Sequence, residues 1–267
     1  MRGKNAVIVI VVTLLAVLFI YYYTTNAHES QELPRGELFI SNITGYVAGY
    51  LNETISLNVY WIKVGDTDFS ATIGVGGLPP CLDADGVTLT GDVGYADSEI
   101  KEMVVSVRLT LKKPGRCVMR NAYLEIQQDN FTKRVPLGRV EFNILEPMEG
   151  KSLKIKSYIG GSVGPEPSVP TLMYSLLNPF NESVEILNVT FDILGLQISN
   201  FEPKEIPAGK TVNLTVTIAN TTELGDLYVI RPLIIYRVGE ETRVMPAETY
   251  HYATIPDEKT VLEMLKD

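Results

Sequence analysis

The sequence predicts an all-β protein in which two β-sandwich domains follow a single N-terminal transmembrane helix. Three observations support this fold class. The chain opens with a long, uninterrupted apolar run. After it, short β-branched and aromatic runs are separated by Gly, Pro, Asn and Asp, a pattern typical of strands joined by turns. The length of 267 residues leaves room behind such a helix for two domains of about 110 residues each.

The predicted transmembrane helix covers residues 6–23, a stretch that contains no charged residue. At about 1.5 Å per residue, a helix of this length spans the hydrocarbon core of a bilayer. Basic residues precede the run and acidic residues follow it. This asymmetry places residues 1–5 in the cytoplasm, residues 24–36 in a polar stalk, and the domains outside the cell. We therefore expect a single-pass protein of the cell membrane with extracellular C-terminal domains.

Two alternatives compete with a retained anchor. The small residues Thr25-Asn26-Ala27 also suit the cleavage site of a secretory signal peptide. A buried core helix is disfavoured, because such helices are rarely apolar on every face. With either an anchor or a cleaved signal, the body of the protein is exported.

The first predicted sandwich covers residues 37–147. In Thr54–Trp61, Ile55, Leu57 and Val59 alternate with polar residues, and 105–111 shows the same period of two. This period is typical of an antiparallel sheet that packs on one face, and it places Tyr60 on the polar face together with Ser56 and Asn58. About seven short strands at this spacing predict a sandwich, most often an immunoglobulin-like one. The other strands are expected near 37–43, 69–74, 118–127 and 137–144.

The second predicted sandwich covers residues 148–255 and begins after the polar break at 146–150. Its strands are expected near 152–158, 170–177, 184–193, 211–218, 227–237 and 242–249. The Gly- and Pro-rich stretch 160–170 is expected to be a flexible loop. Residues 256–267 are expected to form a short helix, because a Pro and two acidic residues open it and an apolar stripe follows. We expect this helix to pack on the second sandwich, although it could also dock a partner or fray.

The chain has two cysteines, Cys81 and Cys117, both beside turn residues of the first sandwich. In an oxidising compartment the simplest expectation is one disulfide, which would stabilise the fold by about 3–4 kcal/mol. Two unpaired buried thiols are the alternative. A metal site is weaker still, because no His or third Cys lies near them in the sequence.

Seven Asn-X-Ser/Thr sequons exceed what chance would produce in this composition. They suggest a glycosylated surface protein, although Asn and Thr also favour exposed turns and strand faces for purely structural reasons. The candidate glycosylation sites are Asn42, Asn52, Asn130, Asn181, Asn188, Asn213 and Asn220.

Residues 177–191 and 206–218 carry a resemblance to a known family. The first reads LNPFNESVEILNVTF and the second IPAGKTVNLTVTI. They resemble the CARDB-like, immunoglobulin-like domains of prokaryotic surface proteins, in which an N-x-x-N turn follows one strand and P-x-G-x-T-V-x-L-x-V leads into another. Together with the sequons and the N-terminal anchor, the resemblance is to an archaeal-type surface protein with tandem domains. A resemblance of this kind implies architecture and no particular activity.

Composition disfavours several classes of function. A net charge of −9 argues against nucleic-acid binding, which needs a basic face. The only histidines are His28 and His251, so a Ser-His-Asp triad or a histidine-ligated metal has little raw material. No Gly-rich phosphate loop is present. We therefore expect no catalytic residue, no cofactor and no metal, and the sequence disfavours a small-molecule ligand.

The acids of the first sandwich leave one ligand alternative open. A faint calcium-loop pattern spans 82–86, but the further ligands of an EF-hand are absent from it. The acids concerned are Asp83, Asp85, Asp92, Asp97 and Glu99.

These observations favour a non-enzymatic, membrane-anchored surface protein that acts as an interaction or accessory subunit. Its partners would be cell-envelope proteins or a membrane complex, and strand addition at a sheet edge is one mode of contact. The alternatives are a filament subunit similar to archaeal pilins, suggested by Arg2-Gly3 before the apolar run, or a glycan- or calcium-binding surface module.

Overall fold

The computed structural model describes residues 36–65, 68–91, 99–128, 131–222 and 224–265. The expected cytoplasmic residues 1–5, the expected transmembrane helix 6–23 and all of the expected stalk except Gly36 lie outside these ranges. Within the described ranges, no helix is both long enough and apolar enough to cross a bilayer. The fold is almost entirely β-strand, as the sequence predicted.

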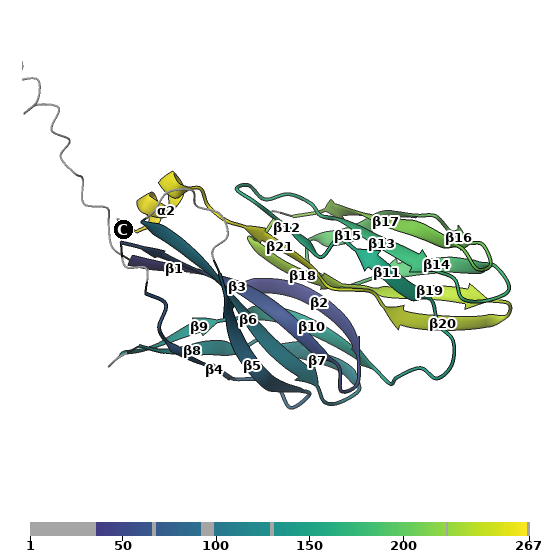
Figure 1. Ribbon diagram of the computed structural model, residues 1–267, viewed down its shortest axis with the longest axis horizontal. Coiled ribbons are helices and arrows are strands. Elements are labelled where there is room, and N and C mark those ends of the chain that lie inside the picture. The colour runs from purple at the N-terminus through teal and green to yellow at the C-terminus, as the bar shows by residue number, and fades with distance from the viewer. Residues whose placement is uncertain (1–35, 66–67, 92–98, 129–130, 223, 266–267) are drawn as a thin grey trace, which may run out of the picture. The chain divides into compact units, whose positions relative to one another are not determined.

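The first half of the fold is built around one four-stranded antiparallel sheet (Figure 1). Its order is β1-β3-β6-β5. The two central strands expose polar side chains on one face and bury alternate apolar ones on the other, Leu57 and Val107 among them. Burial of this apolar row drives the pairing. The bounds are β1 Gly36–Ile40, β3 Thr54–Val64, β6 Ile100–Leu111 and β5 Leu82–Thr90.

The opposing layer of the first half consists of two shorter groups of strands. One is β4-β8-β9, and the other is β2-β10-β7. Gly138 is the first residue of β10 and has a positive φ of 83°. A Cβ at Gly138 would lie 2.3 Å from the Ile43 carbonyl oxygen, so only glycine allows β10 to approach β2. The bounds are β2 Ile43–Tyr50, β4 Thr72–Gly76, β7 Gly115–Met119, β8 Tyr123–Gln128, β9 Phe131–Pro136 and β10 Gly138–Leu145.

The second half repeats this arrangement. One sheet has the order β11-β13-β17-β15 and the other β16-β14-β19-β20. In each half, the seven main strands can be numbered in chain order: β1, β3, β4, β5, β6, β8 and β9 in the first half, and β11, β13, β14, β15, β17, β19 and β20 in the second. In both halves one sheet has the order first, second, fifth, fourth, and the third, sixth and seventh strands lie in the other layer. That order defines an immunoglobulin-like sandwich, so the fold class is confirmed for the described residues. The bounds are β11 Lys154–Tyr158, β13 Thr171–Leu177, β14 Val184–Thr190, β15 Leu196–Glu202, β16 Glu205–Ile206, β17 Thr211–Asn220, β19 Leu233–Val238 and β20 Glu241–Pro246.

The two halves share a six-stranded sheet with the order β12-β21-β18-β2-β10-β7. Three strands of the second half, β12 Gly161–Gly164, β18 Leu227–Arg231 and β21 Tyr250–Thr254, leave their own sandwich and extend the sheet of the first. The joint is the parallel pairing of β18 with β2, from Tyr228 opposite Thr44 to Arg231 opposite Val47. Pro232, which has no N–H to donate, marks the point where β18 leaves the line of β19.

The two faces of the shared sheet serve different halves. Tyr46 and Ala48 of β2 and Ile230 of β18 belong to the hydrophobic core of the second half. The alternate residues of these strands point to the opposite face, toward the first half. For example, a Cβ at Gly49 would meet Leu111 of β6. The chain that follows Pro34 therefore forms one compact unit rather than two separate domains joined by a linker.

Several local expectations were wrong. The stretch 160–170 was expected to be a loop, but it contains strand β12, which gains its hydrogen bonds from β21. Tyr60 was expected on a polar, exposed face, but only 5% of it is exposed. Strands β2, β5, β9 and β15 were also not predicted. In β5, a register shift between Ala84 and Gly86 interrupts the alternation that would have revealed the strand.

The C-terminal helix forms as α2 Glu258–Met264, with the Asp257 carboxylate accepting the Thr260 N–H at 2.8 Å. It does not simply pack on the second sandwich. Leu265, just after it, lies against Gly36 at the start of β1, and α2 appears beside β1 in Figure 1. The reason is the shared sheet: because β21 pairs with β18, which pairs with β2, the chain that leaves β21 emerges next to the first half.

The pairing of β18 with β2 predicts that Gly45→Ala destabilises the protein strongly. A Cβ at Gly45 would lie 2.6 Å from the Val229 carbonyl oxygen, so the two strands would have to move apart. We expect the free energy of unfolding to fall by about 1–3 kcal/mol, as in other overpacked interiors, when measured by urea denaturation. The matched control is Gly74→Ala, where nothing lies within 4 Å of the added methyl group. Equal stability of the two variants would contradict this account of the joint.

Candidate interaction surface

All six described sequon asparagines are exposed, and Asn130 lies outside the described residues. Asn42 and Asn52 occupy turns that flank β2, and Asn52 has a left-handed φ of 65°. In the second half, Asn188 is on β14 and Asn213 is on the central strand β17. Asn181 lies in the turn before β14, and Asn220 ends β17. Each of these side chains can be reached from solvent, as glycosylation requires. Glycosylation of these asparagines stays a prediction.

The predicted disulfide is confirmed. Cys81 lies directly before β5, in one layer of the first sandwich, and Cys117 lies in β7, in the other. The bond therefore joins the two layers and closes a loop with a sequence separation of 36. Cys81 also accepts a backbone hydrogen bond from Lys112 at 2.8 Å, which holds the start of β5 against the end of β6.

The described histidine, His251, lies on β21 between Tyr250 and Tyr252. Burial lowers the pKa of its imidazole to about 4, so the ring is neutral at physiological pH. In the described residues, its Nδ1 is buried without a hydrogen-bond partner. This environment suits a packed strand residue, whereas a general base needs a pKa near the working pH and a group that orients the ring. His28 lies outside the described residues.

The acids considered for calcium are scattered. Asp83 and Asp85 are exposed on the edge strand β5, where Asp85 pairs with Arg108, while Glu99 precedes β6. Asp92 and Asp97 lie outside the described residues. Among the described side chains, no group of three or more His, Cys, Asp or Glu is arranged to hold a metal ion.

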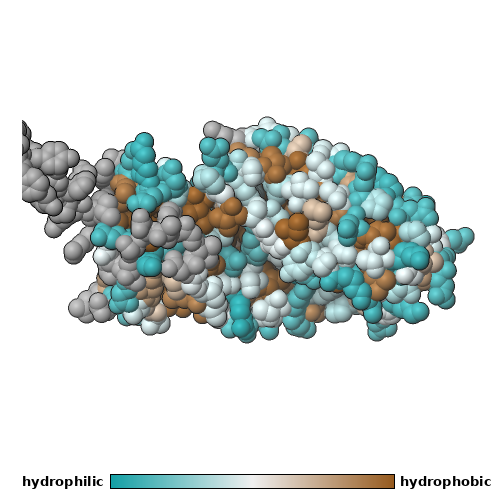
Figure 2. Space-filling model, turned by 45° about the horizontal axis from the view of Figure 1, so that its top comes forward, coloured by the Kyte–Doolittle hydropathy of each residue, from teal (hydrophilic) through white to brown (hydrophobic). Residues whose placement is uncertain are grey.

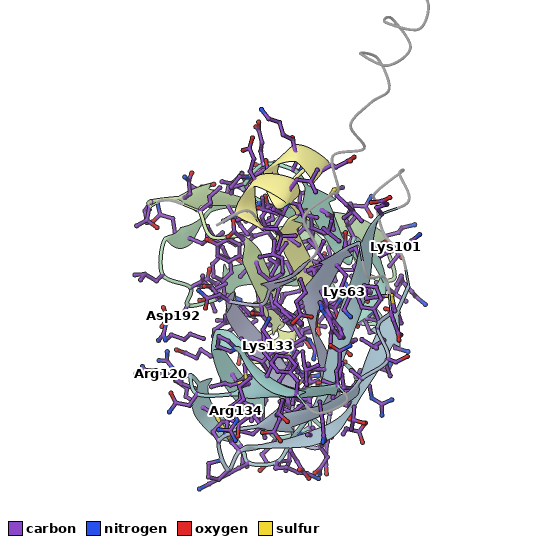
Figure 3. The ribbon with its side chains drawn as sticks, turned by 90° about the vertical axis from the view of Figure 1, so that its left-hand side faces the viewer. Lys63, Lys101, Arg120, Lys133, Arg134 and Asp192 are labelled. Atoms are coloured by element: carbon purple, nitrogen blue, oxygen red, sulfur yellow. A yellow bond between two sulfur atoms is a disulfide. The ribbon has the colours of Figure 1, made fainter. Side chains whose placement is uncertain are left out.

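Basic side chains at one end of the first sandwich come from different strands and face local partners (Figure 3). Lys133 of β9 bonds Glu37 at 2.9 Å, and Arg134 bonds Glu125. Lys63 of β3 is buried, lies 5.0 Å from the centre of the Trp61 ring, and donates to the carbonyl of Asp68. These cations are used within the fold, which leaves them poorly placed to bind phosphates.

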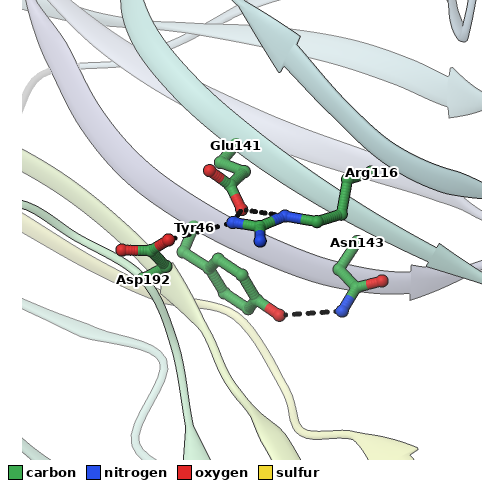
Figure 4. Close-up of polar contacts among 5 residues, drawn as sticks. All are labelled: Tyr46, Arg116, Glu141, Asn143 and Asp192. Carbon is green, nitrogen blue, oxygen red and sulfur yellow. Dashed lines mark hydrogen bonds and ion pairs between the residues drawn. The ribbon is translucent and has the colours of Figure 1, made fainter.

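A polar network crosses between the halves beside the shared sheet (Figure 4). Arg116 donates to the buried carboxylate of Glu141 at 2.9 Å and to Asp192 of the second half at 2.9 Å. Next to it, Asn143 donates to the Tyr46 hydroxyl at 3.1 Å, and burial raises the pKa of Tyr46. This arrangement orients three strands and one loop, and its carboxylates are occupied by a guanidinium.

A second cross-link lies at the far end of the joint. Arg231 of β18 is buried and donates to Glu53 at 2.7 Å and to the Ala247 carbonyl oxygen at 2.7 Å. A buried guanidinium with two charge-assisted bonds is costly to break from one side. The link connects the turn between β2 and β3, in the first half, to β18 and to the segment that follows β20, in the second half.

The turn at Asn178 in the second half has a structural role that the sequence did not reveal. Asn178, fully buried, donates to the carbonyl oxygens of Glu182, Ile206 and Pro207 at 2.9, 2.9 and 3.1 Å. Its own carbonyl accepts the Phe180 N–H. The two segments that carry the family resemblance therefore meet at this one amide, which fixes one turn against the other.

One set of groups that is open to contact with other molecules lies at one edge of the shared sheet. Strand β12 is its outermost strand, and Val163 on it is 51% exposed. His251 donates to Gly160 and Ile255 donates to Gly164, so the backbone groups of Gly161 and Val163 point away from β21. The strand has no charged side chain. Other exposed apolar side chains close by in the chain are Tyr158, Ile159 and Met173.

A hollow lies next to α2 and the start of the first half. Its volume is about 720 Å³, and Leu38, Leu227 and Met264 contribute to its apolar lining. Asn42 also lines it, so a glycan on that residue would stand at its mouth. In the space-filling view, apolar surface appears as separate patches among hydrophilic residues (Figure 2).

Comparison with known proteins gives no family. No model of a protein family matches the chain. No curated protein matches it either.

The solved structures that it matches have low overall similarity. A protein of unknown function from Porphyromonas gingivalis W83 has 12% identity and a TM-score of 0.29, covering 81% of this chain and 99% of its own. The titin domains Z1Z2 in complex with telethonin have 11% identity and a TM-score of 0.22, covering 83% and 97%. The tandem Ig repeats of Dlar have 12% identity and a TM-score of 0.22, covering 84% and 100%. The fold assignment rests on the strand order described above.

The disulfide predicts a measurable loss when both cysteines are replaced. The variant Cys81→Ala/Cys117→Ala should lose about 3–4 kcal/mol of unfolding free energy, because the unfolded chain regains the entropy of the open loop. Urea denaturation of oxidised wild type, reduced wild type and the variant measures this. Reduced wild type should match the variant. Reaction of either cysteine with a thiol reagent in the native, oxidised protein would contradict the bond.

His251 predicts a specific pH dependence. The unfolded imidazole binds a proton below about pH 6.5, but the folded one does so only below about pH 4. Unfolding therefore takes up a proton between these values, and stability falls as the pH falls through that window, by up to about 3 kcal/mol. His251→Gln should remove this part of the pH dependence, while the contribution of the carboxylates stays. The measurement is the unfolding free energy of both proteins at pH 7 and pH 4.5, and an equal loss in both would contradict the burial.

Proposed function

We propose that this chain is a non-catalytic, membrane-anchored surface protein that acts as an accessory subunit by binding an extended segment of another cell-envelope protein. The anchor is the apolar segment 6–23, and the two sandwiches lie outside the cell. The finer resemblance, to CARDB-like domains of archaeal-type surface proteins, belongs to this proposal. It is supported by the Asn178-centred turn that both resembling segments build.

The observation that carries the proposal is the open edge strand β12. Natural sheet edges are commonly protected by a charged side chain or an inward Pro, and β12 has neither between Gly161 and Gly164. Its outward backbone groups at Gly161 and Val163 can pair with an added strand, while the exposed Val163 side chain offers an apolar contact. An extended, mostly apolar partner segment matches this chemistry.

The shared sheet makes that edge rigid before binding. Strand β12 is held by β21, which is held through β18 to the first half. A preorganised edge loses little conformational freedom on binding, so that few hydrogen bonds can suffice for a specific contact.

The exposed sequons and the disulfide support export independently of the edge. Six described sequon asparagines reach solvent, and the bond between Cys81 and Cys117 suits an oxidising compartment. A non-catalytic role is supported by where the polar groups go: the buried Arg231, Asn178 and Glu141 each stabilise a turn or a strand pair.

The test replaces Val163 by Pro in the full-length protein. The Val163 N–H points outward, so Val163→Pro removes a bond to an added strand and leaves the pairing with β21 intact. Val163→Thr, which keeps the N–H, is the matched control. A photo-crosslinking residue at Ser162, with Lys113 as the distant control position, would report contact in cells.

We expect the Ser162 probe to capture a different membrane or envelope protein through an extended segment, and Val163→Pro but not Val163→Thr to abolish the capture. A ladder of this protein with itself would contradict the accessory role and favour a filament. Capture that survives Val163→Pro would contradict strand addition.

A further inference from the structure

We infer that Asn213 carries a glycan whose first sugars lie in the shallow hollow beside it and cover the exposed apolar side chains of Ile159 and Met173. This inference rests on the proposed export of the chain. It goes beyond that proposal by selecting one sequon of seven and by assigning its sugar a binding position on the protein surface.

The strand geometry places the acceptor and its recognition residue on one surface. Asn213 and Thr215 are two residues apart on β17, so both side chains project from the same outer face of the sheet. Asn213 is exposed, whereas Leu214 between them points into the core of the second half. The acceptor amide therefore stands upright at the centre of a sheet face.

The rows next to Asn213 contain apolar surface that nothing in the described chain covers. Ser157, Ser175 and Asn213 form one cross-strand row. In the next row, Met173 lies opposite Thr215, and the Ile159 N–H donates to the Met173 carbonyl oxygen. Ile159 is 47% exposed and Met173 37%, which is unusual for large apolar side chains on a polar sheet face.

A hollow of about 210 Å³ joins these features, and Asn213 is part of its wall. Ile159 and Met173 supply apolar wall, while Ser157 and Ser175 supply hydroxyl groups. None of these side chains is charged. A neutral sugar, with an apolar face of C–H groups and a rim of hydroxyls, matches this lining, and attachment to Asn213 holds it there at high effective concentration.

Asn42 and Asn188 also line hollows, but charged residues line those hollows, among them Asp257 and Lys204 respectively. Asn220 ends the same strand, but it is not part of this hollow. Asn220→Gln is therefore a matched control, since it removes an exposed sequon from β17 without uncovering the hollow.

The experiment uses the full chain produced in a host that glycosylates exported proteins at Asn-X-Ser/Thr. Peptide mass spectrometry reads the occupancy of each sequon, and surface proteolysis of intact cells reads export. Fluorescence of an apolar dye and the Tm are then compared among wild type, Asn213→Gln, Asn220→Gln and Asn213→Gln/Met173→Ser.

We expect a glycan on Asn213, and a rise in dye fluorescence with a Tm lower by roughly 2–4 °C in Asn213→Gln but not in Asn220→Gln. Adding Met173→Ser should lower the dye signal again. An exported protein with other sequons occupied and Asn213 bare would overturn this inference and leave the proposed function standing. So would an occupied Asn213 whose loss does not change dye binding. A protein that is never exported would overturn both.

Discussion

The parallel pairing of β2 with β18 is the interaction on which the rest of the structure depends. Without it the chain would be two immunoglobulin-like sandwiches joined at residues 146–150. With it, β21 and β12 extend the sheet of the first half, and the core of the second half gains Tyr46 and Ala48. Close approach of the two backbones requires a glycine at position 45, because the Val229 carbonyl oxygen occupies the space of a Cβ. The cross-links of Arg231 to Glu53 and of Arg116 to Asp192 secure the two flanks of this joint.

The joint also determines what the protein offers to its surroundings. By carrying β12 to the outside of a sheet built equally from both halves, it creates an edge that neither sandwich would have alone. It also brings α2 and Leu265 back to Gly36, so the described chain starts and finishes at one end of the fold. Two sheet faces of the second half carry a sequon on a strand, at Asn188 and Asn213.

Much of the local structure was predictable, because a period of two is a local signal. The strands around Leu57 and Val107 followed directly from it, and the two cysteines were predicted as a pair from their number and compartment. What escaped prediction was non-local. Strand β12 has almost no side-chain pattern and exists because β21 offers hydrogen bonds, and Tyr60 looked like part of a polar face. The docking of β18 on β2 joins residues almost two hundred positions apart. Its only signals in the sequence are the absence of a Cβ at Gly45 and the break in the strand at Pro232. The candidate edge depends on that docking and was equally hidden.

Native-state hydrogen exchange of the β18 amides tests the central claim most directly. If β18 is a central strand of one shared sheet, the amides of Val229 and Arg231, which face β2, should exchange only through global unfolding, with the same opening free energy as amides of β3 and β6. Exchange of β18 through a separate, cheaper opening, while β3 and β6 stay protected, would contradict the account. The protein would then be two sandwiches in loose contact, and the edge at β12 would have no rigid support.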